Sequence, residues 1–431
     1  MRRTKNNKFY SYYKAIEYLE GLNNIFGSYQ KTNLTSHPNP EMFIKRMQDF
    51  LDQIGNPEKD FKYIHITGTA GKGSVSSIIH TTLFKDKKKT GLFTSPFVTS
   101  TIEKIQVNNK YIDPITFSDI VEYLKPFIDK ATIYGQYGMP SYFEIIFAIA
   151  LIYFKKENCE YVVLEVGLGG RYDATNIIKN PLITAITNID LDHTQILGTT
   201  KDKIAEDKAG IIKKDSHFFT TEDNTKLLSI FEKECKKQGA IYNKCDTNNL
   251  DYLEKNKALA GRICFDIGII KDINNINQSE LLPARFEIIE KKPLIILDGA
   301  HNVSKIQTTI YNLNKIKYNK LSVILTISAD KDWKFILDII LPKVNKLYIT
   351  RFSTSGRQCI NPKDIFEYSQ KYLSKNDISY FSDSREVFYI AKKSLSREDV
   401  LLITGSFYLA GDIRKLYCSE DKILEQRNCK I

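Results

Sequence analysis

Residues 63–79 read Tyr-Ile-His-Ile-Thr-Gly-Thr-Ala-Gly-Lys-Gly-Ser-Val-Ser-Ser-Ile-Ile, and this stretch decides the fold. The apolar run 63–66 predicts a strand, and residues 75–79 predict a helix. The turn between them is rich in glycine, so its backbone N–H groups can face phosphate oxygens, and the helix N-terminus adds partial positive charge. Lys72 could reach the terminal phosphates of a nucleotide, and the Ser74 hydroxyl could bind Mg²⁺. We therefore expect a phosphate-binding turn here.

The spacing of this turn differs from the standard Walker A pattern. That pattern has a glycine at position 66, where Ile66 stands, and Ser or Thr directly after the lysine, where Gly73 stands. Glycine-rich turns beside strands also occur as plain loops. From these residues alone, phosphate binding and a plain loop both stay open.

The composition indicates a globular chain with more than one domain. Its 431 residues are too many for one core, and 42% hydrophobic with 26% charged residues argues against a fibrous or disordered class. No apolar stretch follows the basic start, so we expect no signal peptide, and the apolar run 143–154 is too short to span a membrane. Seven cysteines lie far apart without a Cys-x-x-Cys pair, which argues against disulfides and zinc and favours a cytoplasmic location.

The formal net charge of +11 raises the question of an anionic partner. The lysines are spread along the chain, and no basic-aromatic module typical of nucleic-acid binding is present. We therefore expect neither a nucleic acid nor a membrane as partner. A solvated surface accounts for the charge, and attraction of anionic small substrates into a cleft is the alternative.

Strand and helix patterns alternate along the chain, which predicts an α/β fold with parallel sheets covered by helices on both faces. A second α/β series begins near Phe286. The Asn- and Lys-rich stretch 247–280 has weak periodicity, so we expect an irregular connection there. The expected helices are 8–26, 41–54, 117–128 and 142–155; the expected strands are 63–66, 161–166, 182–187, 294–297, 321–325, 346–349 and 400–403, with a further short strand from Thr90.

Candidate ligands follow the strands of the first series, where open α/β sheets bind their ligands. Glu144 begins a helix, His193 ends Asn-Ile-Asp-Leu-Asp-His, and Lys208 lies in Glu-Asp-Lys-Ala-Gly. A carboxylate, an imidazole and the Ser74 hydroxyl could share the Mg²⁺ ions of a triphosphate. A helix-start carboxylate, a loop histidine and an exposed lysine are the structural alternatives. The glycine-rich run 167–176 allows close backbone approach to a ligand, and there function and structure are equally favoured.

Taken together, these motifs resemble one family. The chain is similar to the folylpolyglutamate synthases and dihydrofolate synthases, members of the Mur ligase superfamily of ATP-dependent amide-forming enzymes. Several motifs are weak individually, but their order along almost the whole chain is highly specific. They are Ile25–Ser28, Thr67–Ser74, Gly91–Phe97, Leu164–Asn176, Thr187–Leu197, Lys208–Lys213, Asp298–Asn302 and Ile403–Leu409.

The resemblance implies an N-terminal P-loop ATPase domain of the Mur ligase type, residues 1–285, which also carries the pterin site. A smaller Rossmann-like glutamate-ligase domain, residues 286–431, would follow. Ser74 and Glu144 would bind one Mg²⁺ and His193 a second. By motif match, the residues that would hold the triphosphate are Gly68, Thr69, Gly71, Lys72, Gly73 and Ser74.

Further residues take their expected roles from the resemblance alone. Lys208 matches the lysine that CO₂ carbamylates in this family, which turns its side chain into a carboxylate beside the second metal. Arg285 matches an arginine that reaches the phosphates, and Asp298 and His301 match positions near the nucleotide and the incoming glutamate. A linker ion pair or a strand-end turn is the alternative for these three. On the substrate side we expect Phe97, Asp173 and Ser406.

The implied reaction joins L-glutamate to a pterin substrate, dihydropteroate or a folate. ATP would phosphorylate the substrate carboxylate, and the glutamate amine would attack the acyl phosphate to give an amide, ADP and phosphate. Lys72, Arg285 and Mg²⁺ would neutralise the charge, and His301 is a candidate base. The resemblance also implies a monomer, and it leaves a monovalent cation open as a further cofactor.

The chain departs from the family pattern at several positions. Ala70 stands where bacterial relatives commonly have Asn, Asp207 replaces Glu, and Lys104 replaces Arg. The segment His-Gln-x-x-Asn that helps to seat adenine is missing, and its nearest counterpart is Tyr252–Asn256, so Asn256 is the expected adenine contact. The alternatives are another Mur-type amide ligase and an ATP-binding relative without catalysis.

Overall fold

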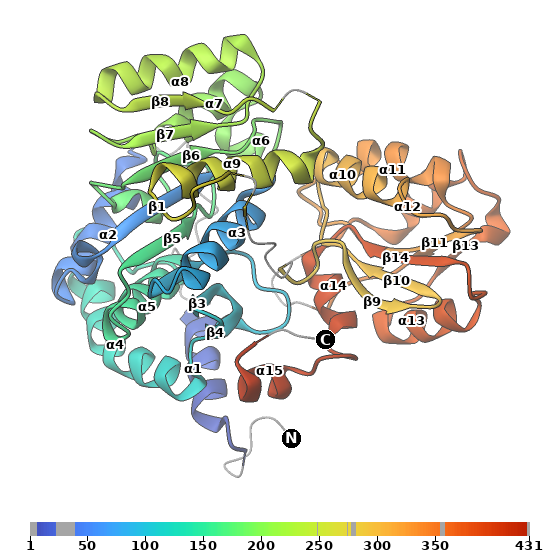
Figure 1. Cartoon of the computed structure of the whole chain (residues 1–431). Coiled ribbons are helices and arrows are strands. Elements are labelled where there is room, and N and C mark those ends of the chain that lie inside the picture. The colour runs from blue at the N-terminus through green and yellow to red at the C-terminus, as the bar shows by residue number, and fades with distance from the viewer. Residues whose placement is uncertain are drawn as a thin grey trace. The chain divides into compact units, whose positions relative to one another are not determined.

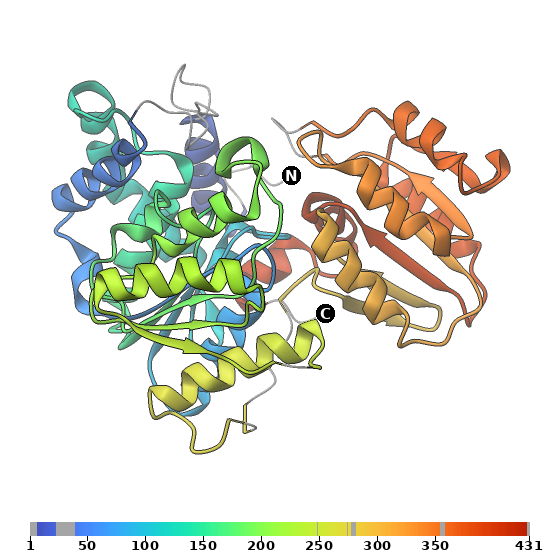
Figure 2. The same ribbon diagram turned by 90° about the horizontal axis from the view of Figure 1, so that it is seen from above.

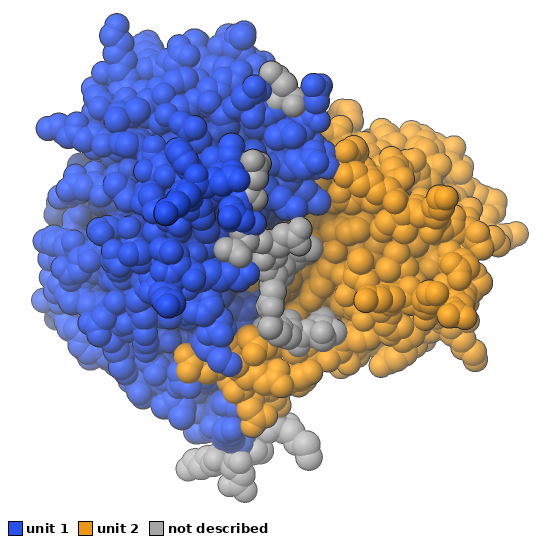
Figure 3. Space-filling view, in the orientation of Figure 1, with its two compact units in different colours: residues 1–95, 102–280 blue, residues 96–101, 281–431 orange. Residues whose placement is uncertain are grey.

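The computed structural model describes residues 7–22, 39–247, 249–273, 275–276, 282–353 and 358–428 (Figure 1). The chain forms two compact units (Figure 3). Unit 1 contains Met1–Ser95 and Ile102–Glu280, and unit 2 contains Pro96–Thr101 and Leu281–Ile431. The short segment Pro96–Thr101 therefore leaves the first unit and packs with the second.

Unit 1 alternates helices with strands over most of its length. Its elements are α1 (Tyr10–Gly21), α2 (Glu41–Gln53), β1 (Lys62–Thr67), α3 (Lys72–Lys85), β2 (Thr90–Phe93), β3 (Ile105–Val107), β4 (Lys110–Tyr111), α4 (Pro114–Tyr134), α5 (Tyr142–Lys156), β5 (Tyr161–Glu165), β6 (Ile183–Ile186), α6 (Thr194–Leu197), α7 (Lys201–Ala209), β7 (His217–Thr220), α8 (Thr225–Gln238), β8 (Ile241–Lys244) and α9 (Tyr252–Asp266).

The eight strands of unit 1 form one sheet in the order β4-β3-β2-β5-β1-β6-β7-β8, and only β3 and β4 run antiparallel to their neighbours. Successive side chains of a strand face opposite sides of a sheet. In β7, Phe219 packs into the core with α3 and α9, whereas Phe218 packs into the core with α7 and α8. Figure 2 shows these helix layers on the two sides of the sheet.

The register of the central strands brings three loops to one edge of the unit 1 sheet. β1 lies parallel to β5 and β6, with Ile66 opposite Glu165 and Thr67 opposite Ile186. The turns that follow these strands therefore start side by side at the carboxyl edge, where ligands of open α/β sheets bind.

Unit 2 is a smaller α/β unit. Its sheet has the order β13-β12-β11-β14-β10-β9, and only β9 runs antiparallel to its neighbour. Its elements are β9 (Glu287–Lys291), β10 (Leu294–Leu297), α10 (Val303–Leu313), β11 (Leu321–Leu325), α11 (Trp333–Ile340), β12 (Lys346–Ile349), α12 (Pro362–Ser369), β13 (Ile378–Tyr380), α13 (Ser384–Lys393), β14 (Val400–Thr404), α14 (Phe407–Arg414) and α15 (Glu420–Gln426).

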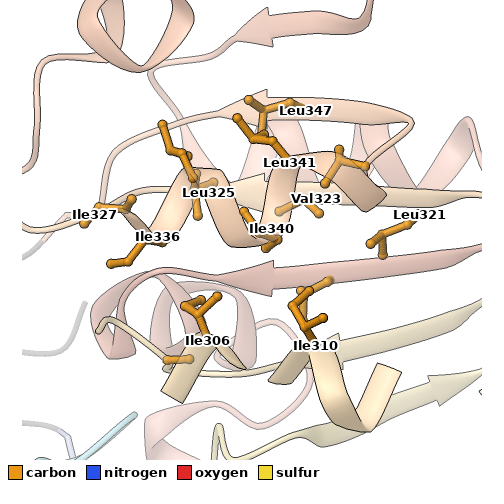
Figure 4. Close-up of a cluster of buried hydrophobic side chains, with 14 of the residues drawn as sticks. Ile306, Ile310, Leu321, Val323, Leu325, Ile327, Ile336, Ile340, Leu341 and Leu347 are labelled. Atoms are coloured by element: carbon orange, nitrogen blue, oxygen red, sulfur yellow. The ribbon is translucent and has the colours of Figure 1, made fainter. Parts of the chain in front are cut away.

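Aliphatic side chains fill both faces of the unit 2 sheet. On one face, Ile306 of α10 and Ile340 of α11 lie over Val323 of β11, and all three are fully buried (Figure 4). On the other face, Ile324 packs with α13 and α14. Largely apolar strands such as β11 and β14 are expected where helices cover both sides of a parallel sheet.

Segment Pro96–Thr101 is fixed inside unit 2 by a buried arginine. Arg414 is fully buried, and its Nε donates to both carboxylate oxygens of Glu287 at 3.0 Å. Its guanidinium also donates to the Thr99 hydroxyl at 3.2 Å. A side chain at Gly411 would place its Cβ 2.1 Å from the Val98 carbonyl oxygen, so the segment lies directly on α14. No pattern in the sequence predicted this contact between the segment and α14.

The expected α/β class and the alternation of elements are confirmed, with ends shifted by a few residues. The expected irregular connection 247–280 was wrong in part, because residues 252–266 form α9, which starts with a capping box between Asp251 and Glu254. The units divide after Glu280, and the predicted boundary after Arg285 stays a prediction.

The motif Ile25–Ser28 and the loop residues Gly27 and Pro38 lie outside the described residues. Among described helices, none is long and apolar enough to cross a membrane.

We predict that Ile340→Ala lowers the free energy of unfolding of unit 2 by about 2–5 kcal/mol, because it leaves a cavity in a close-packed core. Urea unfolding followed by the fluorescence of Trp333, the only tryptophan of the chain, reports on this unit. Phe335→Ala on the same helix is the control, since Phe335 is 65% exposed and its loss should change stability by less than about 0.5 kcal/mol. Equal losses in the two variants would contradict the packing described.

Candidate functional site

The turn between β1 and α3 is built for close backbone approach. Gly68 and Gly71 have φ of 148° and 83°, which residues with a side chain rarely adopt. A Cβ at Gly68 would lie 1.8 Å from the Thr187 hydroxyl oxygen, and one at Gly71 would lie 2.4 Å from the Asn256 amide oxygen. Only glycine therefore fits at either position.

The turn is fastened to the loop that follows β6. Asn188 accepts from the Thr69 N–H through its backbone oxygen and from the Ala70 N–H through its side chain, both at 2.9 Å. The Thr187 hydroxyl donates to the Ala70 carbonyl at 2.5 Å. The amides of Thr69 and Ala70 are thus used inside the protein. A phosphate would instead meet the first N–H groups of α3, which have no partner within the helix.

Lys72 begins α3 and folds back over the turn. Its Nζ donates to the Gly68 carbonyl at 2.8 Å. The ammonium is therefore held at the turn itself, where a bound phosphate would be. The predicted residues Gly73 and Ser74 follow in the first helical turn.

A cavity of about 320 Å³ opens beside this turn. Asn256 lines it from α9, and its side-chain Nδ2 is buried without a hydrogen-bond partner. Buried polar groups usually have a partner, so an orphaned donor beside a cavity points to a ligand acceptor. The residues that line the cavity are Thr187, Asn188, Ile189, Thr221, Glu222, Asp223, Tyr252, Lys255 and Asn256.

Glu144, a predicted metal ligand, is buried and already paired. It closes the capping box of α5 by accepting from the Ser141 N–H at 2.6 Å. Its two oxygens also accept from Arg46 Nε at 2.9 and 3.2 Å. Arg46 lies on α2 and was missed by sequence reasoning, because nothing distinguishes it from other charged residues of that helix. A metal ion at Glu144 would share the carboxylate with Arg46 or displace it.

The predicted metal ligands differ in their donor chemistry. Ser74 and Glu144 offer the oxygen ligands that Mg²⁺ prefers, so they fit this ion. His193 has φ of 50° at the start of α6, and its Nε2 lies 3.9 Å from an Asp192 oxygen. Among the residues that the structure describes, no three His, Cys, Asp or Glu side chains gather as a ready-made metal site. Phosphate oxygens and water, which Mg²⁺ usually keeps among its ligands, would have to complete the coordination.

Lys208 is a buried lysine at the end of α7. Its Nζ donates to the Gly169 carbonyl at 3.4 Å, and burial together with the nearby charge of Lys72 lowers its pKa to about 7. Gly170 allows this packing, because its Cβ would lie 2.8 Å from the Lys208 Cα. A lysine with such a pKa is substantially neutral near pH 7, and the neutral amine is the form that reacts with CO₂.

Asp173, predicted on the substrate side, holds the glycine-rich turn together. Its oxygens accept from the Leu168 N–H at 2.9 Å, the Thr175 N–H at 3.0 Å and the Thr175 hydroxyl at 2.5 Å. The same hydroxyl lies 2.8 Å from His65 Nε2 in β1, and burial lowers the pKa of His65 to about 3. Burial raises the pKa of Asp173. These contacts give Asp173 a structural task, and its substrate contact stays a prediction.

Unit 2 gathers its predicted residues around Phe407. The Arg285 guanidinium lies 4.9 Å from the centre of the Phe407 ring, and the His301 ring lies 5.5 Å from it. Ser406 caps α14 by accepting from the Tyr408 N–H at 3.1 Å. Phe97 belongs to the segment that packs in this unit.

Arg285 stands in a constrained turn. Its neighbours Ala284 and Phe286 both have φ of 53°, a conformation that costs free energy for residues with side chains. Asp298 holds this turn by accepting from the Phe286 N–H at 3.0 Å and the Ala300 N–H at 2.8 Å. Burial raises the pKa of Asp298 to about 6. Asp298 thus lies beside the turn that carries Arg285, and the roles of both residues at the nucleotide stay predictions.

The predicted residues thus fall into two sets. Unit 1 brings together the phosphate turn, Asn256 and Lys208, and unit 2 brings together Arg285, Asp298 and His301. Sequence reasoning missed Asn188, although it lies in the quoted motif Thr187–Leu197, and it missed Lys305, which contacts His301.

Comparison with known proteins assigns the family. Residues 66–273 match the Mur ligase middle domain, and residues 284–407 match the Mur ligase glutamate ligase domain. The dihydrofolate synthase/folylpolyglutamate synthase of Bacillus subtilis is 28% identical over 437 residues, which cover 91% of this chain and 99% of the relative.

Solved structures have the same fold. A folylpolyglutamate synthase from Mycobacterium tuberculosis, complexed with ADP and AMPPCP, superimposes with a TM-score of 0.83 at 22% identity and covers 94% of this chain and 99% of its own. Folylpolyglutamate synthase from Thermotoga maritima gives a TM-score of 0.75 at 26% identity and covers 94% of this chain and 96% of its own. The two domains occur in the order that the motifs predict, and the relatives match over nearly their full length. The chain therefore belongs to the folylpolyglutamate synthase and dihydrofolate synthase family of Mur ligases.

Proposed function

We propose that this protein is an ATP-dependent ligase that adds L-glutamate to dihydropteroate, to a folate, or to both. The observation that carries the proposal is the phosphate turn with the cavity beside it, which presents the orphaned amide of Asn256. Relatives named dihydrofolate synthase/folylpolyglutamate synthase match over almost their full length, which supports the pterin substrate.

The proposed ATP site uses residues of unit 1. The first N–H groups of α3 and the Lys72 ammonium would hold the phosphates, while Asn256 Nδ2 would donate to the adenine in the cavity. From unit 2, Arg285 and Asp298 are proposed to act on the nucleotide as well. Complexes of the Mycobacterium relative with ADP and AMPPCP support a nucleotide in this family.

Ser74, Glu144 and His193 are proposed to hold two Mg²⁺ ions, which would neutralise charge on the transferring phosphoryl group. Lys208 would take part as a carbamate, for which its burial and lowered pKa are the supporting features. A monovalent cation, a monomeric state and a cytoplasmic location stay predictions.

The chain's own groups account for the requirements of the reaction. Lys72 stabilises negative charge as the carboxylate of the pterin substrate becomes an acyl phosphate. The glutamate amine must lose a proton before it attacks, and the neutral imidazole of His301 is the proposed acceptor. Phosphate then leaves and an amide remains.

The proposal is tested by phosphate release from MgATP with L-glutamate present, in parallel with dihydropteroate, with tetrahydrofolate and without a pterin. Each product is checked by mass for one added glutamyl unit. Product with dihydropteroate alone indicates a dihydrofolate synthase, product with tetrahydrofolate alone a polyglutamate synthase, and both a bifunctional enzyme. ATP binding without release in any arm would overturn the folate proposal in favour of another acceptor or a binder without catalysis.

We predict that Lys72→Ala slows phosphoryl transfer by about 100-fold or more, because it removes the ammonium that stabilises the developing charge. Phosphate release with the preferred pterin is the measurement. Lys85→Ala at the other end of α3 is the matched control, since that exposed lysine lies outside the turn. A Lys72→Ala variant as fast as the control would remove Lys72 from the mechanism.

We predict that Lys208→Ala loses about 10- to 100-fold in activity and is partly rescued by formate or acetate, small carboxylates that replace the carbamate. Only the neutral amine reacts with CO₂, so carbamate formation should fall as the pH drops below about 7 and Lys208 becomes protonated. Isotopically labelled bicarbonate and carbon NMR detect the carbamate directly.

Lys203→Ala on the same helix is the control for this prediction, because Lys203 is exposed. It should keep both full activity and the carbamate signal. A labelled signal that persists in Lys208→Ala, or activity equal to the parent, would contradict the role of Lys208.

A further inference from the structure

A lysine outside every predicted role contacts the proposed base of unit 2. Lys305 Nζ lies 3.1 Å from His301 Nε2, and His301 Nδ1 lies 2.8 Å from the Gly299 carbonyl oxygen. A carbonyl oxygen only accepts, so Nδ1 carries the hydrogen and donates. In the neutral ring Nε2 is then the acceptor, and Lys305 donates to it. The nitrogen that would take a proton from the substrate is therefore occupied.

Lys305 is placed firmly. The Asn302 side chain caps α10 by accepting from the Lys305 N–H at 3.0 Å. The next residue, Ile306, is fully buried in the core under α10 (Figure 4). The backbone of Lys305 is thus fixed, and only its flexible side chain can exchange partners.

The surroundings of Lys305 favour an anion. Arg285 and His301 flank the same Phe407 ring, so a second cationic group lies in this cluster. The carboxylate of Asp298, which belongs to the same group of residues, already accepts from the backbone N–H groups of Phe286 and Ala300. An ammonium and a carboxylate attract each other as opposite charges, an attraction that the bond to a neutral imidazole lacks. A substrate carboxylate would therefore compete well with the imidazole for Lys305.

We propose that Lys305 binds a carboxylate of the attacking amino acid and thereby frees His301 Nε2 to accept the proton of that amino acid's ammonium group. This inference rests on the proposed glutamate-ligase function. In the proton transfer, one N–H bond of the ammonium breaks, a bond from that hydrogen to Nε2 forms, and the electron pair stays on the amine, which can then attack. His301 would accept a proton only when an amino acid with a carboxylate is in place.

The experiment compares two nucleophiles with the same acyl phosphate. L-glutamate carries carboxylates, whereas hydroxylamine has none and traps the acyl phosphate as a hydroxamate. For Lys305→Met we expect the KM for L-glutamate to rise about 10- to 100-fold, while hydroxamate formation stays at the rate of the parent. Lys305→Arg keeps the cation and should recover most of the affinity. Lys315→Met, just beyond the other end of α10, is the matched control and should behave like the parent in both assays.

Two further readouts separate this role from simple structural support. The unfolding curve of each variant, followed at Trp333, shows whether unit 2 is intact. Nitrogen NMR of the His301 ring, assigned with His301→Gln, should show a shift of the Nε2 signal when L-glutamate is added to the parent. In Lys305→Met, which lacks the lysine contact, the Nε2 signal should lie at its shifted position even before L-glutamate is added.

The outcomes distinguish the two proposals. If the parent forms neither hydroxamate nor a glutamyl product, the ligase function fails and this inference fails with it. If the parent forms both and Lys305→Met binds glutamate as the control does, or Lys305→Arg binds it as weakly as Lys305→Met, the inference alone is overturned. Equal losses with glutamate and with hydroxylamine would assign Lys305 to the acyl-phosphate step and would also overturn it.

Discussion

Close backbone approach at Gly68 and Gly71 is the constraint on which the site of unit 1 depends. The two glycines let the turn lie against Thr187 and Asn256, where any side chain would collide. The N–H groups of Thr69 and Ala70 donate to Asn188. These hydrogen bonds fix the start of α3 and the position of Lys72. Rigid placement of donors before a ligand arrives lowers the free energy that binding must supply for ordering.

Lysines in different surroundings give the two units different chemistry. In unit 1, burial and a neighbouring ammonium keep Lys208 substantially neutral near pH 7, so that a residue usually cationic can become a nucleophile toward CO₂. In unit 2, the Gly299 carbonyl fixes the tautomer of the His301 ring, and Lys305 donates to the other ring nitrogen. Each unit thus places a lysine against a group whose protonation matters to the proposed reaction.

Periodicity and turn composition were enough to predict the α/β class, most elements and the phosphate turn. They could not predict α9, because its capping box lies in a polar stretch whose apolar face is short, although Leu259 and Ile263 are fully buried. Long-range pairs such as Arg46 with Glu144 leave no mark in a single sequence, since 98 positions separate them. Lys305 and His301 are only four residues apart across the start of α10, but spacing alone cannot show whether two polar side chains are partners.

The excursion of Pro96–Thr101 means that the units are not two consecutive pieces of chain. The polypeptide passes between them three times, and unit 2 is complete only with six residues encoded far upstream of the rest. A gene fragment starting at residue 281 would leave Arg414 without its Thr99 partner and α14 without the backbone that covers Gly411. The smaller unit therefore cannot be exchanged as a cassette between genes, and its evolution is tied to that of the ATP-binding unit.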